Sequence, residues 1–150
     1  MWYAILGAVL LAGDQILKYW VVTHLAVGES APFLPGFMQL TRLHNYGAAW
    51  SSLSGRTVLL VVFTAVLLAA VALLLIKKVV RHWTGITACT LILSGGIGNI
   101  IDRIVHGYVV DMFDLQLFSY PVFNLADCCV VVGAILGGIY SVSYTHLRAH

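Results

Sequence analysis

Four long apolar segments constrain this chain more than any other feature of its sequence. They cover residues 2–22, 58–77, 84–105 and 123–143. The hydrocarbon core of a bilayer is about 30 Å thick, and an α-helix of about 20 residues crosses it. Each segment is long enough to do so, and the sequence therefore predicts four transmembrane helices.

The composition agrees with this prediction. Of the 150 residues, 61% are hydrophobic and 9% are charged, whereas a soluble domain normally has about 25% charged residues. We therefore expect an all-α integral membrane protein with one domain over residues 1–143. Residues 144–150 are more polar and form either a short extension or a non-native tail. The net charge of +2 is small and scattered, so a nucleic-acid partner is not expected.

Orientation follows from the basic residues of one short loop. Lys77, Lys78 and Arg81 lie between the second and third segments, and loops rich in Lys and Arg face the cytoplasm. Both termini are then cytoplasmic, while residues 23–57 and 106–122 lie outside. The first segment lacks a basic n-region and carries charges of its own, so we expect a retained helix rather than a signal peptide.

The first outer segment has a strand-like pattern. Within residues 28–57, the stretch F-M-Q-L-T-R-L-H-N partly alternates apolar and polar side chains. Such alternation is typical of a half-buried β-strand. We therefore expect a short strand or a small sheet at the membrane interface.

Polar residues interrupt two of the apolar segments at helical spacing. A charged side chain near the middle of a bilayer costs at least about 2.5–3.5 kcal/mol, so such residues are functional candidates. Asp14 and Lys18 are four residues apart, and Asn99, Asp102 and Arg103 also share one helix face. With the predicted orientation, all five lie toward the outer leaflet. The alternatives are an intrahelical ion pair and a structural network between helices.

Two further carboxylates, Asp111 and Asp127, lie on either side of a short connection that contains Pro121. Two carboxylates that share a site cannot both ionise easily, so one keeps a proton. Such a pair can activate a water molecule and protonate a carbonyl oxygen or leaving amine, as peptide hydrolysis requires. The alternative is that Asp111 is a solvated residue of the outer loop and Asp127 an acid favoured at a helix N-terminus. Asn124 is expected to cap that helix.

Metal binding and transport are the other functions considered. Cys89, Cys128 and Cys129 lie inside apolar segments without C-x-x-C spacing, and the six histidines are dispersed. We therefore predict no metal and no cofactor. A small proton-coupled membrane carrier is the alternative function, because intramembrane Asp, Lys and Arg relays also mark transporters.

Five motifs in order resemble the lipoprotein signal peptidase family, also called signal peptidase II. They are D-Q-I-L-K at 14–18, N-Y-G-A-A-W at 45–50, G-G-I-G-N-I-I-D-R at 95–103, V-V-D at 109–111 and F-N-L-A-D at 123–127. The similarity extends over nearly the whole chain. Two departures from the family's usual pattern are Trp50 and Met112.

The resemblance implies both a fold and an activity. The family is a bacterial inner-membrane aspartic endopeptidase with four transmembrane helices, a small periplasmic β-cradle and a short outer loop or helix. It removes the signal peptide from prolipoproteins immediately before the diacylglyceryl-modified cysteine. The implied partners are these substrates and membrane lipid, with a monomeric enzyme and an active site near the outer leaflet.

The resemblance also implies roles for individual residues. Asp111 and Asp127 match the catalytic dyad of the family. Residues that match its supporting polar positions around the substrate and the dyad are Asp14, Lys18, Asn45, Asn99, Asp102, Arg103 and Asn124.

Overall fold

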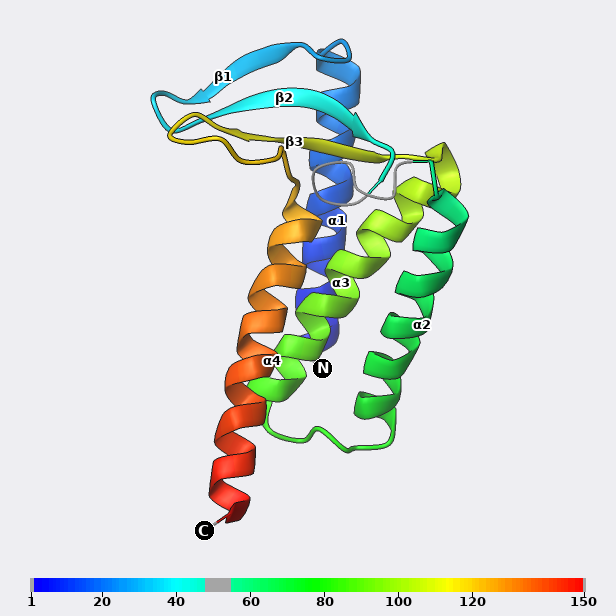
Figure 1. The fold of residues 1–150 in the computed structure, drawn as a ribbon, viewed down its shortest axis with the longest axis vertical. Helices are drawn as coiled ribbons and strands as arrows, with labels where there is room; N and C mark the ends of the chain where they lie inside the picture. The colour runs from blue at the N-terminus through cyan, green and yellow to red at the C-terminus, as the bar shows by residue number, and fades with distance from the viewer. Residues whose placement is uncertain (1, 48–54, 150) are drawn as a thin grey trace.

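The computed structural model describes residues 2–47 and 55–149, with side chains up to residue 144. Within these residues, four helices stand side by side beneath a three-stranded sheet (Figure 1). The elements in chain order are α1 (Trp2–His24), β1 (Ser30–Leu34), β2 (Met38–Asn45), α2 (Thr57–Ile76), α3 (Trp83–His106), β3 (Val109–Leu115) and α4 (Leu125–Ala149). The start of α1, the end of α4 and the α2–α3 loop all lie at the end of the bundle away from the sheet.

The four helices confirm the predicted spans. Each is apolar enough to cross a membrane over at least 18 residues. The fourth helix begins at Leu125 and continues to Ala149, and its part with described side chains, up to Tyr144, is apolar enough to span a membrane. Residues 144–149 of the polar tail therefore continue α4, because loss of apolar character does not by itself end a helix.

α3 is the central helix of the bundle. It packs against α1, α2 and α4, whereas α2 packs chiefly against α3. Half of the apolar span of α3 is buried inside the protein, compared with 6% of that of α2. α3 carries glycines where neighbours come close: a Cβ added to Gly95 would overlap the Ala126 carbonyl oxygen, and one on Gly96 would lie 2.5 Å from the Leu68 side chain. These glycines therefore allow neighbouring helices to approach α3 closely.

The sheet joins two distant parts of the chain. Its order is β1-β2-β3 with antiparallel pairing, and Leu43 of β2 pairs with Asp111 of β3. The described residues of the segment 28–57 contain two strands, in agreement with the expected short strand or small sheet, but the expected outer loop at 106–122 contains the third. The four helices and the small sheet agree with the expected architecture, while the all-α label is not confirmed, since a three-stranded sheet is present. Because its partner strand is far earlier in the chain, β3 had no local signal.

A small apolar core holds the sheet on α1. It consists of Val21, Leu25, Val110 and Met112, of which Met112 is fully buried. At the end of α3, Gly107 adopts a left-handed conformation with φ of 82° and its N–H donates to the Arg103 carbonyl at 3.0 Å. Glycine accepts this conformation without strain, and it turns the chain from α3 directly into β3. Asp111 is therefore brought over the helix bundle.

Candidate active site

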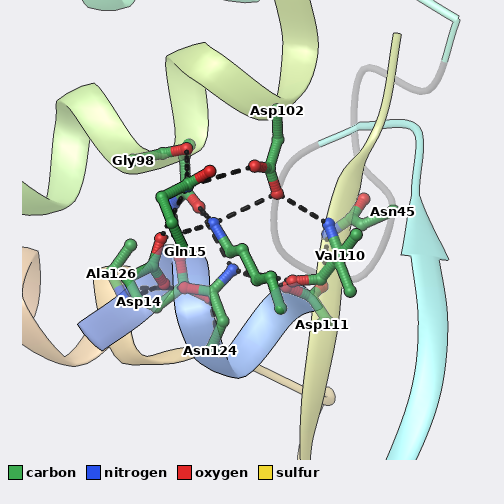
Figure 2. Close-up of polar contacts among 12 residues, drawn as sticks. Asp14, Gln15, Asn45, Gly98, Asp102, Val110, Asp111, Asn124 and Ala126 are labelled. Atoms are coloured by element: carbon green, nitrogen blue, oxygen red, sulfur yellow. Dashed lines mark hydrogen bonds and ion pairs between the residues drawn. The ribbon is translucent and has the colours of Figure 1, made fainter. Parts of the chain in front are cut away.

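All nine predicted site residues meet where α1, α3 and the start of α4 approach β2 and β3. Figure 2 labels five of them, Asp14, Asn45, Asp102, Asp111 and Asn124. They form one connected set of hydrogen bonds and ion pairs, which also includes Gln15 and the backbone of Gly47. We call this set the polar network. Among the described residues, no buried side-chain nitrogen or oxygen lacks a partner. The network is therefore complete within the protein.

The ammonium group of Lys18 lies at the centre of the network. Its Nζ is 2.8 Å from Asp14 Oδ2, 3.1 Å from Asp102 Oδ2 and 3.1 Å from Asn99 Oδ1. A lysine has three N–H donors, so these three acceptors use all of them. Lys18 is 3% exposed, and both carboxylates are buried as well. The cation therefore neutralises buried carboxylates and has no donor left for a ligand.

The two carboxylates beside Lys18 each hold a backbone N–H from another element. Asp14 Oδ1 accepts from Ala126 N at 3.0 Å, and Asp102 Oδ2 accepts from Val110 N at 3.0 Å. Ala126 immediately precedes Asp127, and Val110 immediately precedes Asp111. One ion cluster thus fixes the backbone just before each of the two candidate catalytic residues.

The start of α4 is a reciprocal cap. Asn124 Oδ1 accepts from Asp127 N at 2.8 Å, and Asp127 Oδ2 accepts from Asn124 N at 3.2 Å. This pattern is a capping box with aspartate in place of the usual glutamate. The predicted N-cap role of Asn124 is confirmed, and Asp127 is the acidic residue of the first turn.

Asn124 also joins the two candidate carboxylates. Its Nδ2 is 2.9 Å from Asp111 Oδ1 and 3.1 Å from Asn99 Oδ1, while Asn99 Nδ2 donates to Asp127 Oδ1 at 2.9 Å. Because Lys18 can only donate, Asn99 must direct its oxygen toward Lys18 and its nitrogen toward Asp127. The orientation of both amides is thereby determined, and each carboxylate faces an amide donor.

Asp111 lies on strand β3, not in a solvated loop as the alternative interpretation proposed. It is 2% exposed and also accepts from Asn45 Nδ2 at 3.2 Å. Burial, followed by the charge of Asp127, raises the pKa of Asp111 to about 7, while Asn45, Lys18 and Asn124 act in the opposite direction. Near neutral pH this carboxyl group is therefore divided between its protonated and ionised forms.

Arg103 connects the network to β2. Its Nη2 donates to the Gly47 carbonyl at 3.0 Å, and Gly47 N donates to Asn45 Oδ1 at 2.9 Å. The remainder of the N-Y-G-A-A-W motif, including Trp50, lies outside the described residues. Within the described part of the chain, no group of three His, Cys, Asp or Glu side chains could hold a metal ion.

The family model for signal peptidase (SPase) II matches residues 6–143 of the chain. The chain belongs to the signal peptidase II family. It is 40% identical over 140 residues to a lipoprotein signal peptidase of Enterococcus faecalis, covering 93% of this chain and 87% of that protein. It is 43% identical over 128 residues to one of Streptococcus pyogenes serotype M1, covering 85% and 84%.

The fold agrees with this membership. A solved bacterial membrane enzyme superposes with a TM-score of 0.90 at 32% identity, covering 95% of this chain and 88% of that one. A second one superposes with a TM-score of 0.83 at 34% identity, covering 91% and 90%. Membership of a peptidase family does not favour the carrier that the sequence left as an alternative.

One member of the network, Gln15, was not predicted from the sequence. Its Nε2 lies 3.2 Å from Asp14 Oδ2, 3.2 Å from the Gly98 carbonyl oxygen and 3.3 Å from Asp102 Oδ1. Gln15 precedes Lys18 by three residues and so lies on the same side of the helix. This spacing is the signal that could have identified it.

Proposed function

We propose that the chain is an aspartic endopeptidase that removes signal peptides from diacylglyceryl-modified prolipoproteins, cleaving before the lipidated cysteine, with Asp111 and Asp127 as its catalytic pair. The family and the names of the relatives support the substrate class. The observation that carries the catalytic assignment is the pair itself. Asn124 donates to both carboxyl groups, from its side chain to Asp111 and from its backbone N–H to Asp127, and the pKa of Asp111 is about 7.

Such a pair can perform both proton transfers of peptide hydrolysis. In the resting state it holds one proton, on Asp111, since burial favours the neutral form there. Ionised Asp127 takes a proton from a water molecule, whose oxygen attacks the scissile carbonyl carbon, and Asp111 donates its proton to the carbonyl oxygen. When the tetrahedral intermediate collapses, Asp127 passes its proton to the leaving amine and Asp111 regains one.

The rest of the polar network positions this pair. Asp14, Lys18 and Asp102 hold the backbone before each catalytic residue, and Asn45, Asn99 and Asn124 orient the carboxyl groups. Arg103 holds the chain at Gly47 beside them. Lys18 acts through position alone, because its three N–H groups are already bonded within the protein.

The proposed enzyme lies in the bacterial inner membrane as a monomer, with the sheet on the outer side. The α2–α3 loop, which contains Lys77, Lys78 and Arg81, is at the opposite end of the bundle from the sheet, and such basic loops face the cytoplasm. The substrate's lipid chains would remain in the bilayer and set the register of the scissile bond near the outer leaflet. No metal or cofactor takes part in the proposed reaction.

Cleavage by the purified protein in micelles tests the proposal. The substrates are a diacylglyceryl-modified prolipoprotein and its unmodified precursor, followed by gel shift with a chelator present. We expect only the lipidated substrate to be cut, and Asp127→Asn to leave it intact. Cleavage by folded Asp127→Asn at the wild-type rate, or inhibition by the chelator, would contradict the catalytic assignment.

A further inference from the structure

A cavity of about 700 Å³ lies at the end of the bundle away from the sheet, between α1, α2 and α3. Its wall is mostly apolar, with side chains such as Ala8, Leu75 and Leu93. Thr90 and Ser94 also line it, but their hydroxyls donate to carbonyl oxygens of their own helix at 2.8 Å. The wall therefore offers an apolar ligand a suitable surface, in a volume typical of ligand sites.

Two cations stand at one end of this cavity. Lys78 and Arg81 both line it, and Arg81 Nε donates to the Lys78 carbonyl oxygen at 2.9 Å, which holds the two residues together. All six acidic residues belong to the described part of the chain, and none of them lines the cavity. The positive charge at this position therefore has no carboxylate partner in the cavity wall.

The backbone of Lys78 adds an independent observation. Its φ is +55°, and it is the only non-glycine residue with positive φ in the described part of the chain. It directly follows the C-cap of α2, and the next residue, Val79, donates its N–H to the Leu74 carbonyl at 3.0 Å. Glycine is the favoured residue at this position of a helix end. A lysine held there despite the strain indicates that its side chain has a function.

We infer that this cavity binds one anionic phospholipid. The phosphate group would lie between Lys78 and Arg81, and an acyl chain would extend along the apolar wall between α1, α2 and α3. Basic pockets between transmembrane helices recognise anionic headgroups in this manner. The phosphate group belongs to a lipid, because the cavity wall is formed by three membrane-spanning helices.

Two alternative roles for these charges fit less well. A substrate signal peptide carries a basic n-region, which Lys78 and Arg81 would repel. Membrane orientation alone accounts for basic residues in this loop, but it gives no reason for a strained lysine facing a cavity. Lys78 and Arg81 line both this cavity and a second hollow on the α4 side, whereas Lys77, from the same loop, lines only the second hollow. Lys77 therefore separates lipid binding in the first cavity from orientation alone.

Native mass spectrometry of the delipidated full chain tests the inference. The protein in detergent is titrated with phosphatidylglycerol and phosphatidylcholine that carry the same acyl chains. We expect wild type to bind phosphatidylglycerol more tightly than phosphatidylcholine by on the order of tenfold or more. Removal of each cavity cation should lower the affinity of the protein for phosphatidylglycerol about fivefold. The variants are Lys78→Gln and Arg81→Gln, with Lys77→Gln as the matched control that retains the preference.

Three more variants separate charge, shape and folding. Lys78→Gly relieves the strained backbone but removes the charge, so it should fold at least as well as wild type and lose the preference. Lys78→Arg should keep it. Ala8→Phe fills the cavity without changing the charge and should weaken binding of both lipids.

The inference is overturned by any of three results. Wild type could bind both lipids equally, Lys77→Gln could lose the preference as much as Lys78→Gln does, or Ala8→Phe could leave binding unchanged. The second result would mean a diffuse positive surface, and the third would place the lipid outside the cavity. Circular dichroism and gel filtration confirm that each variant is folded.

Discussion

The two ends of the helix bundle are stabilised by different interactions. At the sheet end, all six acidic residues of the chain lie on or next to the sheet or in the polar network, and every buried polar side-chain atom of the described residues is bonded. At the other end, apolar packing and a basic loop surround cavities. Polar groups within a membrane are tolerated where their partners are complete. This chain therefore gathers nearly all of its buried polar chemistry at one end.

The largest difference between the two ends should appear in activity. Asp111→Asn removes a carboxyl group from the proposed catalytic pair and should lower the cleavage rate by about 10²–10⁴-fold or more. At the other end, Thr90→Val removes a hydroxyl that bonds only to the Ile86 carbonyl of its own helix, so its activity should be close to wild type. Initial rates of prolipoprotein cleavage measure both. Equal rates for wild type and folded Asp111→Asn would contradict the catalytic role proposed for Asp111 at the sheet end.

The next effect is on stability. Lys18→Met leaves the buried carboxylates of Asp14 and Asp102 without their cation, and breaking a buried ion pair typically costs about 3–5 kcal/mol. We expect a markedly lower apparent Tm in detergent and a loss of activity with it. Lys77→Met, which removes an exposed cation at the other end, is the control and should melt like wild type. Similar Tm values for the two variants would show that the ion cluster is not a stabilising centre.

A smaller effect is expected from close packing. A Cβ at position 98 would lie 2.6 Å from Asp14 Oδ2, whereas one at position 138 of α4 would meet nothing within 4 Å. Gly98→Ala should therefore destabilise the protein by about 1–3 kcal/mol. Gly138→Ala should stabilise it by about 0.5–1 kcal/mol, since alanine is the better helix residue. If thermal unfolding ranks the two variants in the opposite order, the tight contact at Gly98 is not required.

The mildest test varies pH. The pKa of Asp111 is raised from 3.8 to about 7, so the folded protein binds more protons than the unfolded chain between about pH 4 and pH 7. The stabilising contribution of this group is complete below about pH 4 and is lost as the pH rises through about 7. We therefore expect kcat/KM to fall about tenfold per pH unit above 7, as the proposed acid is ionised. Stability should fall between about pH 4 and pH 7, and it should fall less over this range in Asp111→Asn. A flat pH–rate profile between pH 6 and pH 9 would argue against Asp111 as the acid.

Sequence patterns predicted the elements with strong local signals. The apolar spans, the helix face shared by Asn99, Asp102 and Arg103, and the cap at Asn124 all depend on residues close together in the chain. The third strand was missed, because β3 pairs with β2 from a distant segment and its residues 109–115 carry no clear alternation. Gln15 was missed as well, because an uncharged side chain gives no signal of its own. Its spacing from Lys18 becomes informative only once Lys18 is known to be buried.

Hydropathy and charge in the sequence were enough to identify four helices that could span a membrane and to predict that the polar residues concentrate toward one end. Its ordered motifs also identified the family. Tertiary packing was needed to show that Lys18 bonds both Asp14 and Asp102, and that these two hold the backbone before Asp127 and Asp111. The physical reason is the separation along the chain of the residues that interact. Hydropathy and helical spacing are local properties of a chain, whereas a buried hydrogen bond between α1 and α4 or α3 and β3 exists only once the helices have packed.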